Sequence, residues 1–149
     1  MKRISANAAI MARILVSIVF LLNSTGVIDQ SIPAKEMAER GAPEAMVPMF
    51  MLFARSLELV AGLALAFGVL PRLAALALLA FLIPATLVSH SFWLSAGTPA
   101  FMGQLINFSK NVAIWGGLLF IGATAEQPAW VRSVAARMKR AVQIPAAGR

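Results

Sequence analysis

Four long apolar stretches constrain this chain more than any other feature of its sequence. They run over residues 8–28, 47–70, 73–89 and 104–123. Each comes close to the roughly 20 residues that an α-helix needs to cross the hydrocarbon core of a bilayer. Of the 149 residues, 60% are hydrophobic and only 13% are charged, which is too apolar for a soluble domain of this length. We therefore expect an all-α integral membrane protein, built as a four-helix transmembrane bundle.

The distribution of basic residues predicts the orientation of this bundle. Lysines and arginines gather at the N-terminus, in the turn at Arg72 and after the fourth stretch, which all lie on one side of a four-span protein. On the opposite side, Lys35 and Arg40 are offset by four acidic residues. The positive-inside rule then places both termini in the cytoplasm and segments 29–46 and 90–103 outside. The net charge of +7 therefore indicates contact with membrane lipids rather than with nucleic acid.

The chain divides into a membrane domain, residues 1–125, and a basic tail, residues 126–149. Apolar residues recur in the tail at helical spacing, with arginines and lysines at other positions. These residues are Trp130, Val131, Val134, Met138 and Val142. We expect a C-terminal basic amphipathic helix that lies on the inner membrane surface.

Polar residues inside the apolar stretches mark the candidate site, because a charge in hydrocarbon costs several kcal/mol and usually faces a bundle interior. At a rise of 1.5 Å per residue, Arg55 lies ~12 Å and Glu58 ~16 Å from the outer end of their span. The catalytic candidates are Glu58 and Lys110, and the substrate-binding candidates are Arg55, His90, Gln104, Asn107 and Asn111. If these faces turn inward, Arg55 or Lys110 neutralises Glu58. The surplus positive charge then suits an anion, a quinone oxygen or a polar lipid headgroup.

Other interpretations of this polar layer stay open. Buried polar side chains often only hold helices together, at about 0.6 to 2 kcal/mol per hydrogen bond. One glutamate and one histidine make a thin chain for proton conduction. Cysteine is absent and His90 is the single histidine, so thiol chemistry, Cys-ligated clusters and bis-His haem are excluded and no metal site is expected.

Several of these residues resemble the pattern of a known family. They are Arg13, Phe20, Gly26, the run 41–43, Glu58, Gly62, Gly68 and Arg72, followed by the run 90–93, Gln104 and the run 107–119. The pattern is similar to the DoxX family of small four-span bacterial membrane proteins, related to the DoxD subunit type, over residues 11–123. The resemblance implies a protein of the bacterial cytoplasmic membrane. It also implies an association with quinone-linked redox complexes, in which DoxD-type proteins take part in thiosulfate:quinone oxidoreduction.

The residues and the resemblance together predict a small membrane subunit of a quinone-linked redox complex that is not catalytic alone. Its polar pocket would lie in the outer half of the bilayer and bind a quinone or a small anion, with quinone as the one cofactor considered. One alternative is a scaffold subunit that docks a larger assembly, and a weaker one is a small transporter. Further protein subunits or a second copy of the chain are the expected partners.

Overall fold

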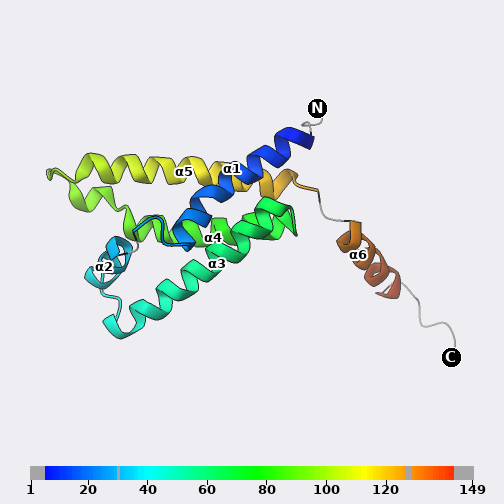
Figure 1. Cartoon of the computed structure of the whole chain (residues 1–149), viewed down its shortest axis with the longest axis horizontal. Helices are drawn as coiled ribbons and strands as arrows, with labels where there is room; N and C mark the ends of the chain where they lie inside the picture. Colours follow the sequence, from blue (N-terminus) through cyan, green and yellow to red (C-terminus); the bar gives the residue numbers. More distant parts are fainter. Residues whose placement is uncertain (1–5, 30, 127–128, 143–149) are drawn as a thin grey trace.

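Four long helices form the body of the molecule. The computed structural model describes residues 6–29, 31–126 and 129–142. The helices are α1 (Ala6–Ser24), α3 (Val47–Phe67), α4 (Pro71–Ser89) and α5 (Phe101–Thr124), and each is long and apolar enough to cross a membrane. No strand occurs in these described ranges. The predicted all-α four-helix bundle is therefore confirmed (Figure 1).

The bundle consists of two helix pairs. Helix α1 packs along α3 and α4 packs along α5, while the contacts of α3 with α4 join the pairs and those of α1 with α5 are fewer. One end of the bundle carries the short α3–α4 connection, and we call it the turn end. The other end carries the short helix α2 (Ser31–Glu39), which contacts α3 and α4, and we call it the α2 end. Figure 1 shows α3 diverging from α5 towards the α2 end.

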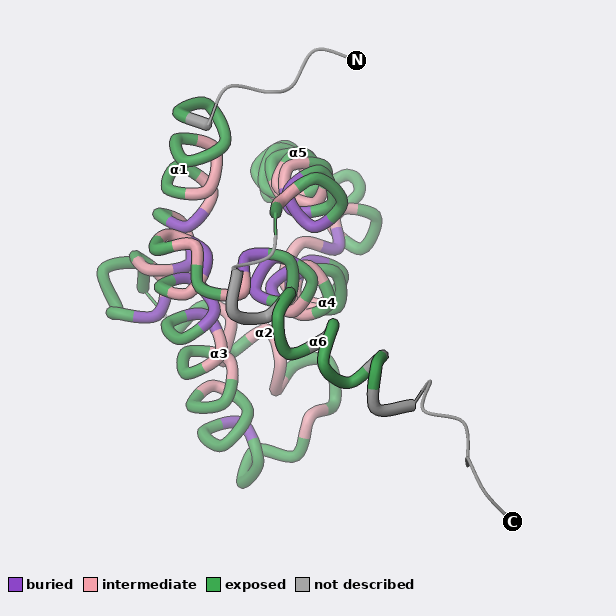
Figure 2. Tube along the Cα trace, turned by 90° about the vertical axis from the view of Figure 1, so that its right-hand side faces the viewer, coloured by how far each residue is buried: buried purple, intermediate pink, exposed green. Residues whose placement is uncertain are grey.

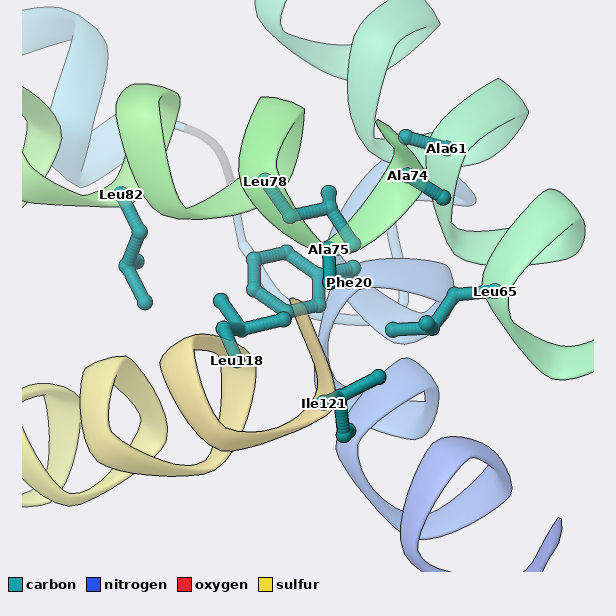
Figure 3. Packing of buried hydrophobic residues seen from close by; sticks show 9 residues of the cluster. All are labelled: Phe20, Ala61, Leu65, Ala74, Ala75, Leu78, Leu82, Leu118 and Ile121. Atoms are coloured by element: carbon teal, nitrogen blue, oxygen red, sulfur yellow. The ribbon is translucent and has the colours of Figure 1, made fainter. Parts of the chain in front are cut away.

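The hydrophobic core lies between the four helices. Figure 3 shows Phe20 of α1 between Leu78 of α4 and Leu118 of α5, with Leu65 of α3 nearby. The last three side chains are fully buried, at 0% exposure. Buried positions face neighbouring helices, and the outward faces are exposed and rich in large apolar residues (Figure 2). An apolar outer surface suits contact with lipid, as expected for a membrane bundle.

The turn end is closed by a tight connection with left-handed backbone. Gly68 adopts φ 71°, where glycine has no Cβ penalty, and Leu70 adopts φ 50° just before Pro71 begins α4. The guanidinium of Arg13 packs over this turn, 3.2 Å from the point where a Cβ on Gly68 would lie. Arg72 donates a 2.8 Å hydrogen bond to the carbonyl of Ala123 in the last turn of α5. Both cations lie near helix C-termini, where a positive charge is favourable.

Helix α1 is shorter than predicted. It ends at Ser24 rather than near residue 28, because Gly26 takes a left-handed conformation with φ 80°. The amide of Gly26 donates to the carbonyl of Asn23, and that of Ile28 donates to the carbonyl of Leu22. These bonds complete the last turn of the helix before the chain leaves it.

The segment at the α2 end is held by local capping. Asp29 accepts hydrogen bonds from the amide and the hydroxyl of Ser31, at 2.9 and 2.8 Å, at the start of α2. These bonds favour the ionised carboxylate and lower the pKa of Asp29. A 3-10 turn, η1 (Glu44–Met46), leads into α3, and a second one, η2 (Phe92–Ser95), follows α4.

The predicted helix in the basic tail is present as α6 (Ala129–Val142). It follows the bundle and is drawn apart from it (Figure 1). The side chains of Trp130, Val131 and Val142 lie outside the described part of the chain, whereas Val134 and Met138 are exposed. Its place on the inner membrane surface stays a prediction, as does the division of the chain at residue 125.

Candidate functional site

A cavity of about 720 Å³ lies between the two helix pairs at the α2 end. This volume is within the range of about 300–1,000 Å³ that is typical of small-molecule sites. All four spanning helices and α2 contribute to its wall. Its apolar lining includes four phenylalanines, two methionines and several aliphatic residues, and among them are Phe20, Phe50, Phe53, Phe81, Met37, Met51, Ile32 and Val88. Its polar lining consists of Asn23, Asp29, Glu36, Glu58, Ser89, His90, Asn107, Lys110 and Asn111.

Glu58 is the most buried of the ionisable residues that line the cavity. Its side chain is only 3% exposed, because α3 turns this position towards α1. The Nδ2 of Asn23 on α1 donates a 2.7 Å hydrogen bond to Oε1 of Glu58. The bond fixes the carboxyl group at the wall of the cavity, and its other oxygen has no hydrogen-bond donor among the described residues.

Arg55 does not form the expected ion pair with Glu58. Its Nε donates a 3.0 Å hydrogen bond to the carbonyl of Ser24, and its side chain does not line the cavity. Lys110 does line the cavity but forms no ion pair with Glu58 either, since the only salt bridges in the described ranges lie at α2 and at the start of the tail. Arg55 remains close enough to attract the carboxyl group of Glu58, but neither cation forms the expected direct ion pair with it. The reason is that the long arginine side chain reaches the free carbonyl at the end of α1.

Helix α5 brings a second set of polar groups to the cavity. Asn111 donates a 3.0 Å hydrogen bond to Oγ1 of Thr86, whose own hydroxyl donates to the carbonyl of Leu82 in α4. Thr86 is 1% exposed, so this contact ties α5 to α4 inside the bundle. Asn107 and Lys110 are exposed to the cavity and have no hydrogen-bond partner in the described part of the chain. They are therefore free to donate to a ligand.

A side-chain bridge connects α2 with the ends of α4 and α5. Gln104 donates a 3.2 Å hydrogen bond from Nε2 to Oε1 of Glu36, and its Oε1 lies 2.9 Å from Nδ1 of His90. Since an amide oxygen only accepts, the Nδ1 of His90 carries the proton. Close by, Arg40 donates to the hydroxyl of Ser91, which donates to the carbonyl of Leu87. These bonds hold α2 over the mouth of the cavity.

The cavity does not have the surplus of positive charge that the sequence predicted. Arg55 is outside the lining, whereas Asp29 and Glu36 belong to it together with Glu58. Three carboxyl groups therefore face one lysine, Lys110. This balance favours a neutral or cationic ligand over an anion.

The cavity thus gathers five of the seven candidate residues, while Gln104 supports it from the mouth and Arg55 lies outside. The candidates chosen from the sequence do not include three residues of this site, Asn23, Asp29 and Glu36. Asn23 carried a signal, because it is a polar residue inside the first apolar stretch. Asp29 and Glu36 carried none, since they lie in a polar segment that reads as solvent-exposed.

Comparison with known proteins gave one match. The DoxX family model matches residues 8–91, which cover α1 to α4 and the cavity walls that these helices supply. The run from Gln104 to residue 119 lies beyond the matched residues. No curated protein and no solved structure gave a significant match.

Proposed function

Because the chain belongs to the DoxX family of membrane proteins, whose model matches more than half of its length, we propose that it is the membrane subunit of a quinone-linked redox complex. The cavity at the α2 end would hold the quinone. The observation that carries this proposal is a cavity of about 720 Å³ whose apolar, aromatic wall also presents unpaired polar groups. A quinone has the same two-part character, with polar carbonyl oxygens on a ring that bears an apolar tail.

The polar groups of the cavity provide hydrogen-bond donors for the carbonyl oxygens of the ring and a carboxyl group that can exchange a proton with it. Lys110 and Asn107 offer N–H donors to one carbonyl oxygen from the side of α5. Glu58 lies in the wall formed by α3 and α1 and holds or accepts a proton of the reduced ring. Two electrons and two protons convert a quinone into a quinol, and in this proposal a partner subunit supplies or removes the electrons.

The charge balance supports the quinone over the small anion. An anion beside Lys110 would share the cavity with the carboxyl groups of Asp29, Glu36 and Glu58. Repulsion between the anion and these carboxyl groups would be strong in a site of low dielectric constant, whereas a neutral quinone ring is not repelled by them.

Photolabelling with a quinone that carries an azido group tests the proposal in lipid nanodiscs. Labels are expected on residues of the cavity wall, such as Phe53 and Ala85. Glu58→Gln and Lys110→Met are expected to weaken quinone binding about tenfold, as loss of one charge-assisted hydrogen bond of roughly 1.5 kcal/mol implies. The matched controls are Glu39→Gln and Lys35→Met, which change an exposed ion pair away from the cavity. Labels spread over the lipid-facing surface, or equal effects of both variant pairs, would overturn the assignment.

A further inference from the structure

We propose that the cavity is a water-filled vestibule that opens only at the α2 end and conducts protons between that aqueous side and Glu58. This inference rests on the proposed function in one respect, since quinone chemistry at Glu58 needs a source and a sink of protons. The observation that carries it is one cavity whose lining includes Asp29, Glu36 and His90, which are exposed or half-buried near the α2 end, and Glu58, which is only 3% exposed.

The titratable groups form a sequence from the mouth inwards. Asp29 is fully exposed in the α1–α2 connection and ionised, because its two bonds to Ser31 lower its pKa. Glu36 and His90 follow at the mouth and are linked through Gln104, and Glu58 lies deeper on α3. The sequence predicted only Glu58 and His90 as members of a proton path, and the structure adds the carboxyl groups of Asp29 and Glu36 to the same cavity. Water in the cavity would bridge the remaining steps.

The opposite end of the bundle is closed. Leu65, Leu78 and Leu118 are completely buried, and with Phe20 they fill the space between the helices (Figure 3). Leu65 lies about two turns nearer the turn end of α3 than Glu58. Arg13 covers the turn at Gly68. A packed apolar core of this kind has no polar groups to hold a chain of water. Protons therefore reach Glu58 from the α2 end alone, which the positive-inside rule places outside the cell.

The electrostatics of the vestibule favour positive charge. Asn23 of α1 donates a hydrogen bond to Glu58, and Arg55 on the same helix as Glu58 attracts its carboxyl group while donating from Nε to the carbonyl of Ser24. Lys110 of α5 lines the same cavity. Among the described residues of α4, none with an ionisable side chain lines the cavity; His90 follows directly as the C-cap of this helix, and α2 presents Glu36. Carboxyl groups thus outnumber Lys110, and a narrow cleft lined mainly by one sign of charge concentrates the opposite ion.

Cysteine accessibility tests the vestibule directly, because the natural chain contains no cysteine. The reporter is Ala54→Cys, one turn from Glu58 on the cavity wall. The matched control is Val60→Cys, which lies on the same helix but is 68% exposed on the outer face and does not line the cavity. Ala96→Cys, in the exposed loop after α4, identifies the side of the α2 end and normalises reagent reactivity. Membrane-impermeant thiosulfonates, one cationic and one anionic, are applied to right-side-out and inverted vesicles.

We expect Ala54→Cys to react only from the side on which Ala96→Cys reacts, and Val60→Cys to stay unmodified. The normalised ratio of cationic to anionic reagent should exceed one. It should fall roughly three- to tenfold when Asp29→Asn and Glu36→Gln are combined, and rise in Lys110→Met. Reaction of Ala54→Cys from the opposite side, from both sides or from neither would overturn the vestibule, and a preference for the anionic reagent would overturn its charge selectivity.

Proton delivery is measured by infrared difference spectroscopy on oriented proteoliposomes. The carboxyl band that Glu58→Gln removes should respond to a pH step on the α2 side and not to one on the turn side. A response to the turn side, or to neither side, would contradict the proposal. None of these measurements contains a quinone, so failure of quinone binding and failure of the vestibule are seen separately.

Discussion

Replacing Asn23 by leucine isolates the contact that holds Glu58 in the bundle. The variant removes the 2.7 Å hydrogen bond from Asn23 Nδ2 and leaves a carboxyl group that is 3% exposed without it. Hydrogen bonds to charged groups contribute about 1.5–3 kcal/mol in soluble proteins. Those between membrane helices average ~0.6 and reach ~1.7 kcal/mol. Because Glu58 is buried, we expect Asn23→Leu to cost about 1–2 kcal/mol.

The matched control is Asn107→Leu, the same substitution on another spanning helix. Asn107 is exposed to the cavity and has no hydrogen-bond partner in the described ranges, so its loss should change stability by less than about 0.5 kcal/mol. A double-mutant cycle with Glu58→Met separates the contact with Glu58 from all others that Asn23 makes. In the Glu58→Met background, Asn23→Leu should cost about 1 kcal/mol less than in the natural protein.

Reversible unfolding in mixed detergent micelles, followed by tryptophan fluorescence, measures these free energies. A difference of 1.4 kcal/mol changes the ratio of folded to unfolded protein tenfold, which such curves resolve. Equal costs for Asn23→Leu and Asn107→Leu would refute the reasoning. So would a cost of Asn23→Leu that is the same in both backgrounds, because the loss would then not come from Glu58.

Three further variants test other parts of the structure. Gly68→Ala should cost about 1–2 kcal/mol in the same unfolding assay, since φ is 71° there and an added Cβ would meet Arg13; no loss would show that the turn relaxes freely. Leu78→Ala should lower the free energy of unfolding by about 2 kcal/mol, which is at the low end of the costs measured in the cores of soluble proteins because lipid also solvates leucine. Leu52→Ala on the exposed face should leave it unchanged. Asp29→Ala should loosen α2 in hydrogen exchange above the ordinary pKa of aspartate. Because the pKa of Asp29 is lowered in the folded protein, its capping bonds lose their stabilising effect as the pH falls through this lowered pKa. The difference in hydrogen exchange between Asp29→Ala and the natural protein should vanish there, and a difference that does not change with pH would contradict the capping role.

The four spans were predictable from sequence because hydropathy alone determines them. A stretch of apolar residues near 20 in length has few alternatives to a membrane helix. The ends of the helices were less predictable, as α1 shows, because the left-handed turn at Gly26 depends on three-dimensional bonding rather than on hydropathy.

The site was predictable only where a polar residue interrupts an apolar helix. Glu58, Lys110 and Asn111 fulfil this condition, and all three line the cavity. Glu36 does not, since nothing in a polar nine-residue helix shows that one of its side chains turns back to Gln104. Arg55 interrupts an apolar helix but does not line the cavity, because its position on the helix does not determine where the end of a long side chain lies.

The uneven packing along the bundle also bears on how such a protein can diversify. The turn end holds most of the apolar core, whereas many positions of the cavity wall at the α2 end are not part of that core. Substitutions at wall positions such as Phe50, Phe53 or Ala85 therefore alter the shape of the site at small cost in stability. A single scaffold of this design can be adapted to many ligands by mutation of one half, while the other half keeps the fold.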